Sequence, residues 1–214
     1  MKGAILFDLD GTLIDSTEAI LECFARSFLR FGLEVPPKEQ IVPLIGHPLD
    51  FMFAHLGIKS NVKPFVDAYK ECYRKISAQK TELLPGAKEA VEEASRFAKL
   101  GVVTTKTGLY SKELLLHLNL LHYFEVVIGR EDVVNPKPHP EPIFKALHII
   151  GEVSQRSWMI GDTCLDMDAA KRAGVGAVAV LCGYGTKEQL TRCSEHIRKD
   201  AKEAVDLVRR FLDR

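Results

Sequence analysis

Short apolar runs alternate with amphipathic stretches along most of this chain. Five runs of four or five mainly apolar residues predict strands, because strands buried on both faces of a parallel sheet are apolar throughout. These strands are expected at residues 4–7, 101–105, 125–128, 157–160 and 177–181. Apolar residues at helical spacing predict helices at residues 87–100, 111–118, 140–150, 166–173 and 201–212. The alternation predicts an α/β fold with a doubly wound, mostly parallel sheet and a Rossmann-like core.

One long segment after the first strand lacks this alternation. It shows helical periodicity and no convincing strand, with helices expected at residues 16–31, 38–45, 49–56 and 62–79. We therefore predict two parts in the chain. Residues 1–14 and 83–214 form the α/β core, and residues 15–82 form a small helical cap domain inserted after the first strand.

Charged and hydroxyl side chains follow the ends of the predicted strands. They are, in chain order, Asp8, Asp10, Thr104, Lys137, Asp162 and Asp166. Ligands of doubly wound sheets bind at the carboxyl ends of the strands, so these side chains are expected to meet at one edge. Residues two apart in an extended chain point the same way, so Asp8 and Asp10 are expected to project together.

The carboxylates in this set indicate a divalent metal site, a site where carboxylates share a proton, or both. Two carboxylates in a small volume repel each other unless a cation or a proton lies between them. Hard oxygen ligands suit Mg²⁺, which keeps several waters and bridges to phosphate oxygens. Asp162 is expected to hold the metal, with Asp166 binding it through water or orienting the other ligands.

The same residues fit phosphoryl transfer. The Asp8 carboxylate can attack phosphorus and form an aspartyl-phosphate. Asp10 can protonate the leaving oxygen and later take a proton from the attacking water. Thr104 can donate a hydrogen bond to a phosphate oxygen, and Lys137 can neutralise charge as a point cation.

Composition excludes several other classes of protein. The 214 residues include 29 Lys and Arg against 29 Asp and Glu, which gives no reason to expect nucleic acid or an anionic membrane as a partner. No apolar stretch approaches the ~20 residues that span a bilayer, and the first strand is too short for a signal peptide, so we expect a cytoplasmic protein. The five cysteines are scattered and odd in number, which favours reduced thiols over disulfides or structural zinc.

Four sequence motifs, taken together, resemble those of the haloacid dehalogenase superfamily of phosphatases. Their order and spacing match over essentially the whole chain, and the helical insertion resembles the small cap of that superfamily. The motifs are Asp8-Leu9-Asp10-Gly11-Thr12, Val102-Val103-Thr104-Thr105-Lys106, Lys137 within Asn-Pro-Lys-Pro, and Gly161-Asp162-Thr163-Cys164-Leu165-Asp166. Within the superfamily the chain is most similar to phosphoglycolate phosphatases and to their pyrophosphatase and sugar-phosphatase relatives.

The resemblance implies a Mg²⁺ ion bound by Asp8, by the main-chain carbonyl of Asp10 and by Asp162. It also implies a cap that opens and closes over the substrate and excludes bulk water. Asp10 distinguishes the chain from the metal-free dehalogenases of the superfamily, which lack this second aspartate. The second motif departs from the Thr-Asn-Lys of close relatives, because Thr105 stands where they carry asparagine.

Substrate contacts are expected from the motif turns and from one cap loop. Main-chain donors of Leu9 and Gly11, the side chains of Thr12 and Thr105, and Lys106 are the candidates near the phosphate. His47, in the loop Gly46-His47-Pro48, is the candidate for a carboxylate or a second phosphate of the substrate. No lysine of the predicted cap is assigned as a residue that forms a Schiff base with the substrate. Each cap lysine is explained just as well as a residue on a solvent-exposed helix face.

Three functions fit these residues. The first is a Mg²⁺-dependent phosphatase of a small phosphorylated metabolite, most similar to phosphoglycolate, acting as a monomer or homodimer. The second is a phosphomutase or inorganic pyrophosphatase of the same fold. The third is a non-catalytic regulatory module that is phosphorylated on aspartate, although such modules lack both a second aspartate like Asp10 and a cap. Fold alone does not choose among them.

Overall fold

A six-stranded parallel sheet forms the centre of the protein. The computed structural model describes residues 3–213, and its sheet has the strand order β5-β4-β1-β6-β7-β8 with every neighbouring pair parallel. The strands are β1 (Ala4–Phe7), β4 (Lys99–Val103), β5 (Val126–Ile128), β6 (Ser157–Gly161), β7 (Gly176–Val180) and β8 (Ile197–Arg198). The predicted α/β class with a doubly wound parallel sheet is confirmed.

Strand β1 lies at the point where the order of the strands reverses. The chain continues from β1 to β4 and β5 on one side, and then crosses to β6, β7 and β8 on the other. All four residues of β1 are fully buried, and successive side chains alternate between two cores. Ile5 and Phe7 join the larger core, whereas Ala4 and Leu6 join the smaller one. Ligands of such sheets bind where the strand order reverses, so the end of β1 is the expected site.

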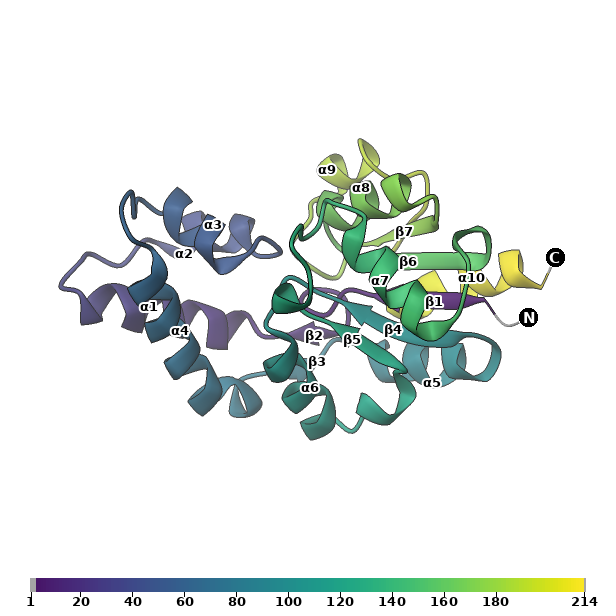
Figure 1. The fold of residues 1–214 in the computed structure, drawn as a ribbon, viewed down its shortest axis with the longest axis horizontal. Helices are drawn as coiled ribbons and strands as arrows, with labels where there is room; N and C mark the ends of the chain where they lie inside the picture. Colours follow the sequence, from purple (N-terminus) through teal and green to yellow (C-terminus); the bar gives the residue numbers. More distant parts are fainter. Residues whose placement is uncertain (1–2, 214) are drawn as a thin grey trace.

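Helices cover both faces of this sheet (Figure 1). On one face α7 packs on β4 and β5 while α8 packs on β6 and β7, and on the other face α5 and α10 pack together. The helices of this part are α5 (Ala87–Phe97), α6 (Gly108–His117), α7 (Glu141–Ile150), α8 (Cys164–Ala173), α9 (Lys187–Thr191) and α10 (Ala201–Leu212). The sequence did not indicate α9 or the two-residue strand β8, because both are too short to show a period.

Two boundaries differ from the sequence-based prediction at the second strand. The helical pattern predicts a helix as far as residue 100, but residues 99 and 100 belong to β4, because Ala4 and Ile5 of β1 pair with Lys99 and Leu100. The strand ends at Val103, so Thr104 and Thr105 lie beyond its carboxyl end. Cross-strand pairing therefore overrides the helical pattern of these residues, as tertiary context often does.

The segment between the first and second core strands is helical and forms a lobe beside the sheet (Figure 1). Helices α1 and α4 pack side by side, and α3 packs on α4. The helices are α1 (Thr17–Arg30), α2 (Lys38–Ile41), α3 (Leu49–His55) and α4 (Lys63–Ile76), with 3₁₀ turns at Val42–Leu44 and Ser77–Gln79. The lobe is connected to the core by two chain segments, β2 (Ile14–Asp15) and β3 (Glu82–Leu83), which pair with each other antiparallel.

Four of the five cysteines form disulfide bonds, so the expectation of reduced thiols is wrong for these four. Cys23 of α1 is bonded to Cys72 of α4, and Cys164 at the start of α8 is bonded to Cys193 after α9. Cys182 is free. Sequence spacing did not reveal the pairs, because each joins elements that only the fold brings together. Among the described residues, no helix has the length and apolar character needed to cross a bilayer.

Candidate active site

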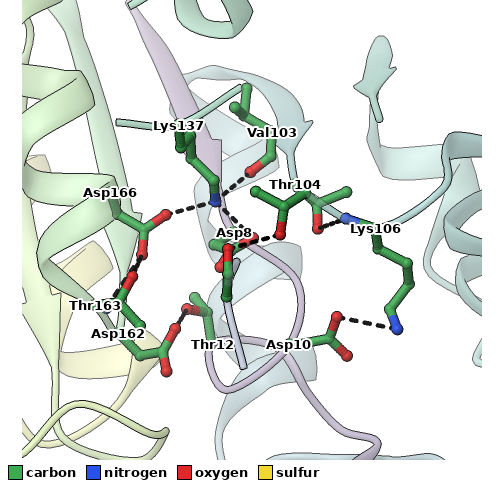
Figure 2. Close-up of polar contacts among 12 residues, drawn as sticks. Asp8, Asp10, Thr12, Val103, Thr104, Lys106, Lys137, Asp162, Thr163 and Asp166 are labelled. Carbon is green, nitrogen blue, oxygen red and sulfur yellow. Dashed lines mark hydrogen bonds and ion pairs between the residues drawn. The ribbon is translucent and has the colours of Figure 1, made fainter. Parts of the chain in front are cut away.

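Side chains from three strand ends and from the first turn of a helix converge at the carboxyl edge of the sheet, around the end of β1 (Figure 2). Asp8 directly follows β1, Thr104 follows β4, Asp162 follows β6, and Asp166 lies in the first turn of α8. Each of these four side chains is buried, with at most 5% of its residue surface exposed. Segments far apart in the sequence therefore place polar groups in one water-poor volume, as the parallel topology predicts.

The ammonium group of Lys137 lies at the centre of this cluster. Its Nζ is 2.9 Å from Oδ1 of Asp8 and 2.6 Å from Oδ1 of Asp166, and it donates a hydrogen bond to the carbonyl oxygen of Val103 at 3.0 Å. The Lys137 side chain is 2% exposed. Burial disfavours the ammonium form, but the two carboxylates outweigh this effect and raise the pKa of Lys137 above its ordinary value. Lys137 is therefore a fixed positive charge beside Asp8.

Three buried carboxylates lie close together beside this cation, and two of them, Asp8 and Asp166, contact it. Asp8, Asp162 and Asp166 each offer an oxygen within 4.8 Å of the others. Burial, together with the nearby Asp166, raises the pKa of Asp8 to about 7 even though Lys137 opposes the shift. Burial and the charges of Asp166 and Asp8 raise the pKa of Asp162 well above its ordinary value. One lysine does not balance three carboxylates, so the cluster fits a divalent cation, and its all-oxygen donor set fits Mg²⁺.

Hydrogen bonds from neighbouring loops orient the carboxylates. Asp162 accepts a hydrogen bond from the hydroxyl of Thr12 at 3.3 Å and one from the main-chain N–H of Tyr184 at 2.7 Å. Asp166 accepts two from Thr163, one from its N–H at 3.1 Å and one from its hydroxyl at 2.8 Å. Thr12 therefore orients a carboxylate, whereas the sequence placed it among the substrate contacts. Such outer contacts fix the geometry of metal ligands.

Two glycines allow the loops to approach Asp162 closely. Gly11 has a φ of +78°, and a Cβ at this position would lie 2.3 Å from Oδ2 of Asp162. A Cβ at Gly183 would lie 2.2 Å from the same oxygen and 2.3 Å from the carbonyl oxygen of Gly11. The turn after β1 and the loop after β7 thus close around one carboxylate because neither carries a side chain there.

The carboxylate of Asp10 lies apart from the three-carboxylate cluster (Figure 2), so Asp8 and Asp10 do not project together. Its Oδ2 is 3.1 Å from Nζ of Lys106, and its Oδ1 accepts a hydrogen bond from the hydroxyl of Ser16. The strand ends at Phe7, so the alternation of an extended strand does not hold as far as Asp10. Of the Asp10 oxygens, only the main-chain carbonyl oxygen stays a candidate metal ligand.

A cavity of about 270 Å³ lies between the helical lobe and the core and reaches Asp10. Thr105 lines this cavity and joins the core to the lobe, because its hydroxyl donates a hydrogen bond to the carbonyl oxygen of Gly46 at 2.8 Å. His47 lines the cavity and stacks on Phe51 of α3 at 4.2 Å between ring centroids. Burial, with His55 nearby, lowers the pKa of His47 and so disfavours its charged imidazolium form. The wall is mostly apolar and aromatic, and its cations are Lys70, Lys106 and Arg130.

Three residues near the site were not selected from the sequence. The N–H of Tyr184 binds Asp162, and the hydroxyl of Ser16 binds Asp10. Tyr73 of α4 accepts a hydrogen bond from Lys106. The rule that sites follow strand ends could have indicated Tyr184, because it lies in the Gly-rich loop after β7. No sequence signal marks Tyr73, which has the spacing of an ordinary core residue of its helix.

Comparison with known proteins gives concordant matches. The family model described as haloacid dehalogenase-like hydrolase matches residues 5–180. The chain is 33% identical over 181 residues to a phosphoglycolate phosphatase of Aquifex aeolicus, covering 84% of this chain and 85% of that one. It is 33% identical over 178 residues to the pyrophosphatase PpaX of Bacillus cereus, covering 82% of each. A haloacid dehalogenase-like hydrolase structure from Streptococcus pneumoniae superimposes with a TM-score of 0.87 at 28% identity, covering 96% and 98% of the two chains.

Proposed function

The chain belongs to the haloacid dehalogenase-like hydrolase family, and from this premise we propose that it is a Mg²⁺-dependent phosphatase of a small phosphorylated metabolite. The observation that carries the proposal is the buried Asp8 carboxylate, which lies beside Lys137 and within metal-sharing distance of Asp162 and Asp166. A nucleophile, a fixed cation and a cation site at one point are the parts that phosphoryl transfer needs.

Asp8 performs the first displacement in the proposed reaction. One oxygen of its carboxylate forms a bond to phosphorus while the bond from phosphorus to the ester oxygen breaks. The leaving oxygen takes a proton from Asp10. A water then attacks the aspartyl-phosphate and gives a proton to Asp10, which frees inorganic phosphate and restores Asp8. Lys137 balances charge throughout, because its pKa is raised and it stays protonated.

Mg²⁺, held by Asp8, Asp162 and the main-chain carbonyl of Asp10, would neutralise charge on the transferring phosphoryl group. Asp166 would orient this site, because its carboxylate oxygens already bind Lys137 and Thr163. The main-chain N–H of Leu9 and the hydroxyl of Thr104 are the proposed contacts to the phosphate oxygens. The N–H of Gly11 donates instead to the carbonyl oxygen of Ile14 at 2.9 Å, so Gly11 contributes the turn and not a donor. Domain closure of residues 15–82 over the core, at residues 1–14 and 83–214, would exclude water during the reaction.

The cavity next to Asp10 is the proposed site of the leaving group. Phosphoglycolate-like monoesters are the preferred substrates, since relatives with this name match most of the chain. Pyrophosphate is the second candidate, supported by the relatives named pyrophosphatase and by the cations Lys70 and Arg130 in the cavity wall.

A cytoplasmic monomer or homodimer stays the prediction. Two disulfides fit that location in cytoplasms that sustain such bonds, as those of hyperthermophiles do.

The decisive experiment measures phosphate release from 2-phosphoglycolate, pyrophosphate, hexose phosphates and 4-nitrophenyl phosphate, with Mg²⁺ and with a chelator. Hydrolysis is expected only with Mg²⁺, and Asp8→Asn is expected to abolish it for every substrate because an amide does not attack phosphorus. The matched control is Asp168→Asn, on α8 outside the carboxylate cluster, which should retain activity. Near-native turnover by Asp8→Asn would show that Asp8 is not the nucleophile. Interconversion of sugar-phosphate isomers without phosphate release would indicate the phosphomutase instead.

A further inference from the structure

A contact between the helical lobe and the core ends on the carboxylate of Asp10. Lys106, in the core, reaches Oδ2 of Asp10 at 3.1 Å and donates a hydrogen bond to the phenol oxygen of Tyr73 at 2.8 Å. The ammonium nitrogen also lies 4.2 Å from the centre of the Tyr73 ring. Tyr73 belongs to α4 of the lobe and is 1% exposed. One ammonium group therefore joins the lobe to the proposed acid/base.

Removing the Lys106 ammonium group from water is unfavourable, and its two partners offset this cost. The side chains of Lys106 and Asp10 are 9% and 11% exposed, so both have lost most of their water. A buried cation is stable only where an opposite charge and good acceptors surround it. Asp10 supplies the charge, while Tyr73 supplies the acceptor and the face of its ring. The position of Lys106 therefore depends on where Tyr73, and with it α4, lies.

The other oxygen of Asp10 is also held from the lobe side. Its Oδ1 accepts a hydrogen bond from Ser16, which directly precedes α1 and follows the connecting strand β2. Both carboxylate oxygens of Asp10 are thus fixed by groups whose positions depend on the helical lobe. Asp8, in contrast, is held by Lys137, a core residue. A movement of the lobe would displace the contacts of Asp10 and leave those of Asp8 in place.

We propose that Lys106 and Tyr73 are positioning residues that couple the seating of the helical lobe to the placement of the Asp10 carboxylate. Lobe closure would bring Tyr73 to Lys106, and Lys106 would then hold Asp10 where it delivers a proton to the leaving oxygen. Proton delivery is thereby restricted to the closed, water-excluding form. The proposal rests on the proposed phosphatase function, because it assigns Asp10 the role of acid and base.

The test compares substrates that need proton delivery with one that does not. The 4-nitrophenolate group leaves as an anion, whereas an alkyl alkoxide such as that of 2-phosphoglycolate needs a proton as it departs. The readout is kcat/KM, because it reports the steps up to formation of the aspartyl-phosphate and leaves out the later attack of water, which uses Asp10 for every substrate. Tyr73→Phe, which keeps the ring, is expected to lower kcat/KM for the alkyl phosphate about tenfold, a part of the 10²–10⁴ that acid catalysis supplies. Its kcat/KM for 4-nitrophenyl phosphate should change less than about twofold. Tyr123→Phe, outside the cavity, should change neither value.

The lysine is tested in the same way. Lys106→Met, which removes the charge, is expected to show the same selective loss as Tyr73→Phe, and Lys106→Arg should recover part of the alkyl phosphate activity because it restores a cation. Lys112→Met, an exposed residue of α6, is the control. Thermal melting of each variant shows that it is folded. A double variant of Lys106→Met and Tyr73→Phe should lose no more than either single variant, since the two residues act on one carboxylate.

Two outcomes would overturn the proposal. Equal losses of kcat/KM on both substrates would mean that Lys106 and Tyr73 only bind substrate or support the fold, and unchanged kcat/KM on both would mean that they position nothing. Failure of the proposed function itself has a different result, because wild type would then release phosphate from neither substrate, or Asp8→Asn would still hydrolyse both. With Asp8→Asn inactive and no change in leaving-group dependence, the phosphatase assignment would stand and the coupling would be refuted.

Discussion

At the residue scale, the site contains two buried lysines with different partners. Lys137 forms ion pairs within the three-carboxylate cluster, and Lys106 forms an ion pair with Asp10. The sequence indicated Lys137 through its place after a strand, because topology alone brings such positions together. It did not reveal the partner of Lys106, since Tyr73 comes from an inserted segment whose orientation no core motif determines. Asp10 illustrates the same limit, because its side-chain direction depends on a turn and on Ser16.

Replacing Lys137 by Ala is expected to cost both activity and stability. The variant would leave buried carboxylates uncompensated, so its metal-free form should lose about 3–5 kcal/mol of unfolding free energy at pH 8. Saturating Mg²⁺ should restore part of this loss, because a divalent cation also balances the carboxylates. Denaturant unfolding with and without Mg²⁺ measures both effects.

The matched control for this variant is Lys63→Ala. Lys63 pairs with Asp67 on the surface, where the two side chains are 79% and 57% exposed. Water screens such a pair, so its loss should cost less than about 1 kcal/mol and leave hydrolysis unchanged. Equal losses in the two variants would show that burial gives Lys137 no special role.

At the scale of elements, the long periodic segments were the predictable part of the fold. Helices α1, α4, α7 and α10 and strands β1 and β6 appear where apolar spacing placed them, because each buries a continuous face. The two-residue strands β2 and β3 were not foreseen, since so short a pair forms only because the fold brings the two connecting segments side by side. The disulfides were missed for the same reason, as each joins elements distant in sequence.

The disulfide between Cys23 and Cys72 is expected to stabilise the helical lobe. It bridges α1 and α4 across 49 residues, so it restricts the unfolded chain by an amount worth about 2–4 kcal/mol. The Cys23→Ala, Cys72→Ala double variant should therefore unfold at lower denaturant concentration than the unmodified oxidised protein. Reduction should lower the stability of the unmodified protein by more than that of the double variant. An equal midpoint for the double variant and the oxidised protein would show that the bond constrains nothing.

At the scale of the whole molecule, the buried carboxylates of the site lower the stability of the folded protein. Three carboxylates are packed against one ammonium group at the centre of the sheet edge, where strand order reverses. Burial raises the pKa of Asp8 and of Asp162, which means that the charged forms are disfavoured in the folded protein relative to the unfolded chain. A fold that placed apolar groups there would be more stable and would have no site.

This conflict gives the metal-free protein a pH dependence of known sign. The pKa of Asp8 is about 7 in the folded protein against an ordinary value of 3.8, so between these values the folded state binds more protons than the unfolded chain. The contribution of Asp8 to stability is therefore fully present below about pH 4 and is lost as the pH rises through about 7. Mg²⁺ should reverse this trend, because it binds the deprotonated cluster and competes with protons.

Thermal unfolding of wild type and Asp8→Asn between pH 5 and pH 8 tests this argument, because the asparagine variant removes the titrating group and leaves the rest of the cluster. The melting temperature of metal-free wild type should fall relative to that of Asp8→Asn as the pH rises over this interval, so the variant becomes the more stable protein at the upper end. With saturating Mg²⁺ the order should invert at pH 8, since wild type keeps the ligand that the variant lacks. Parallel melting curves for the two proteins at every pH, with no response to Mg²⁺, would mean that Asp8 neither titrates in this range nor shares a cation with Asp162.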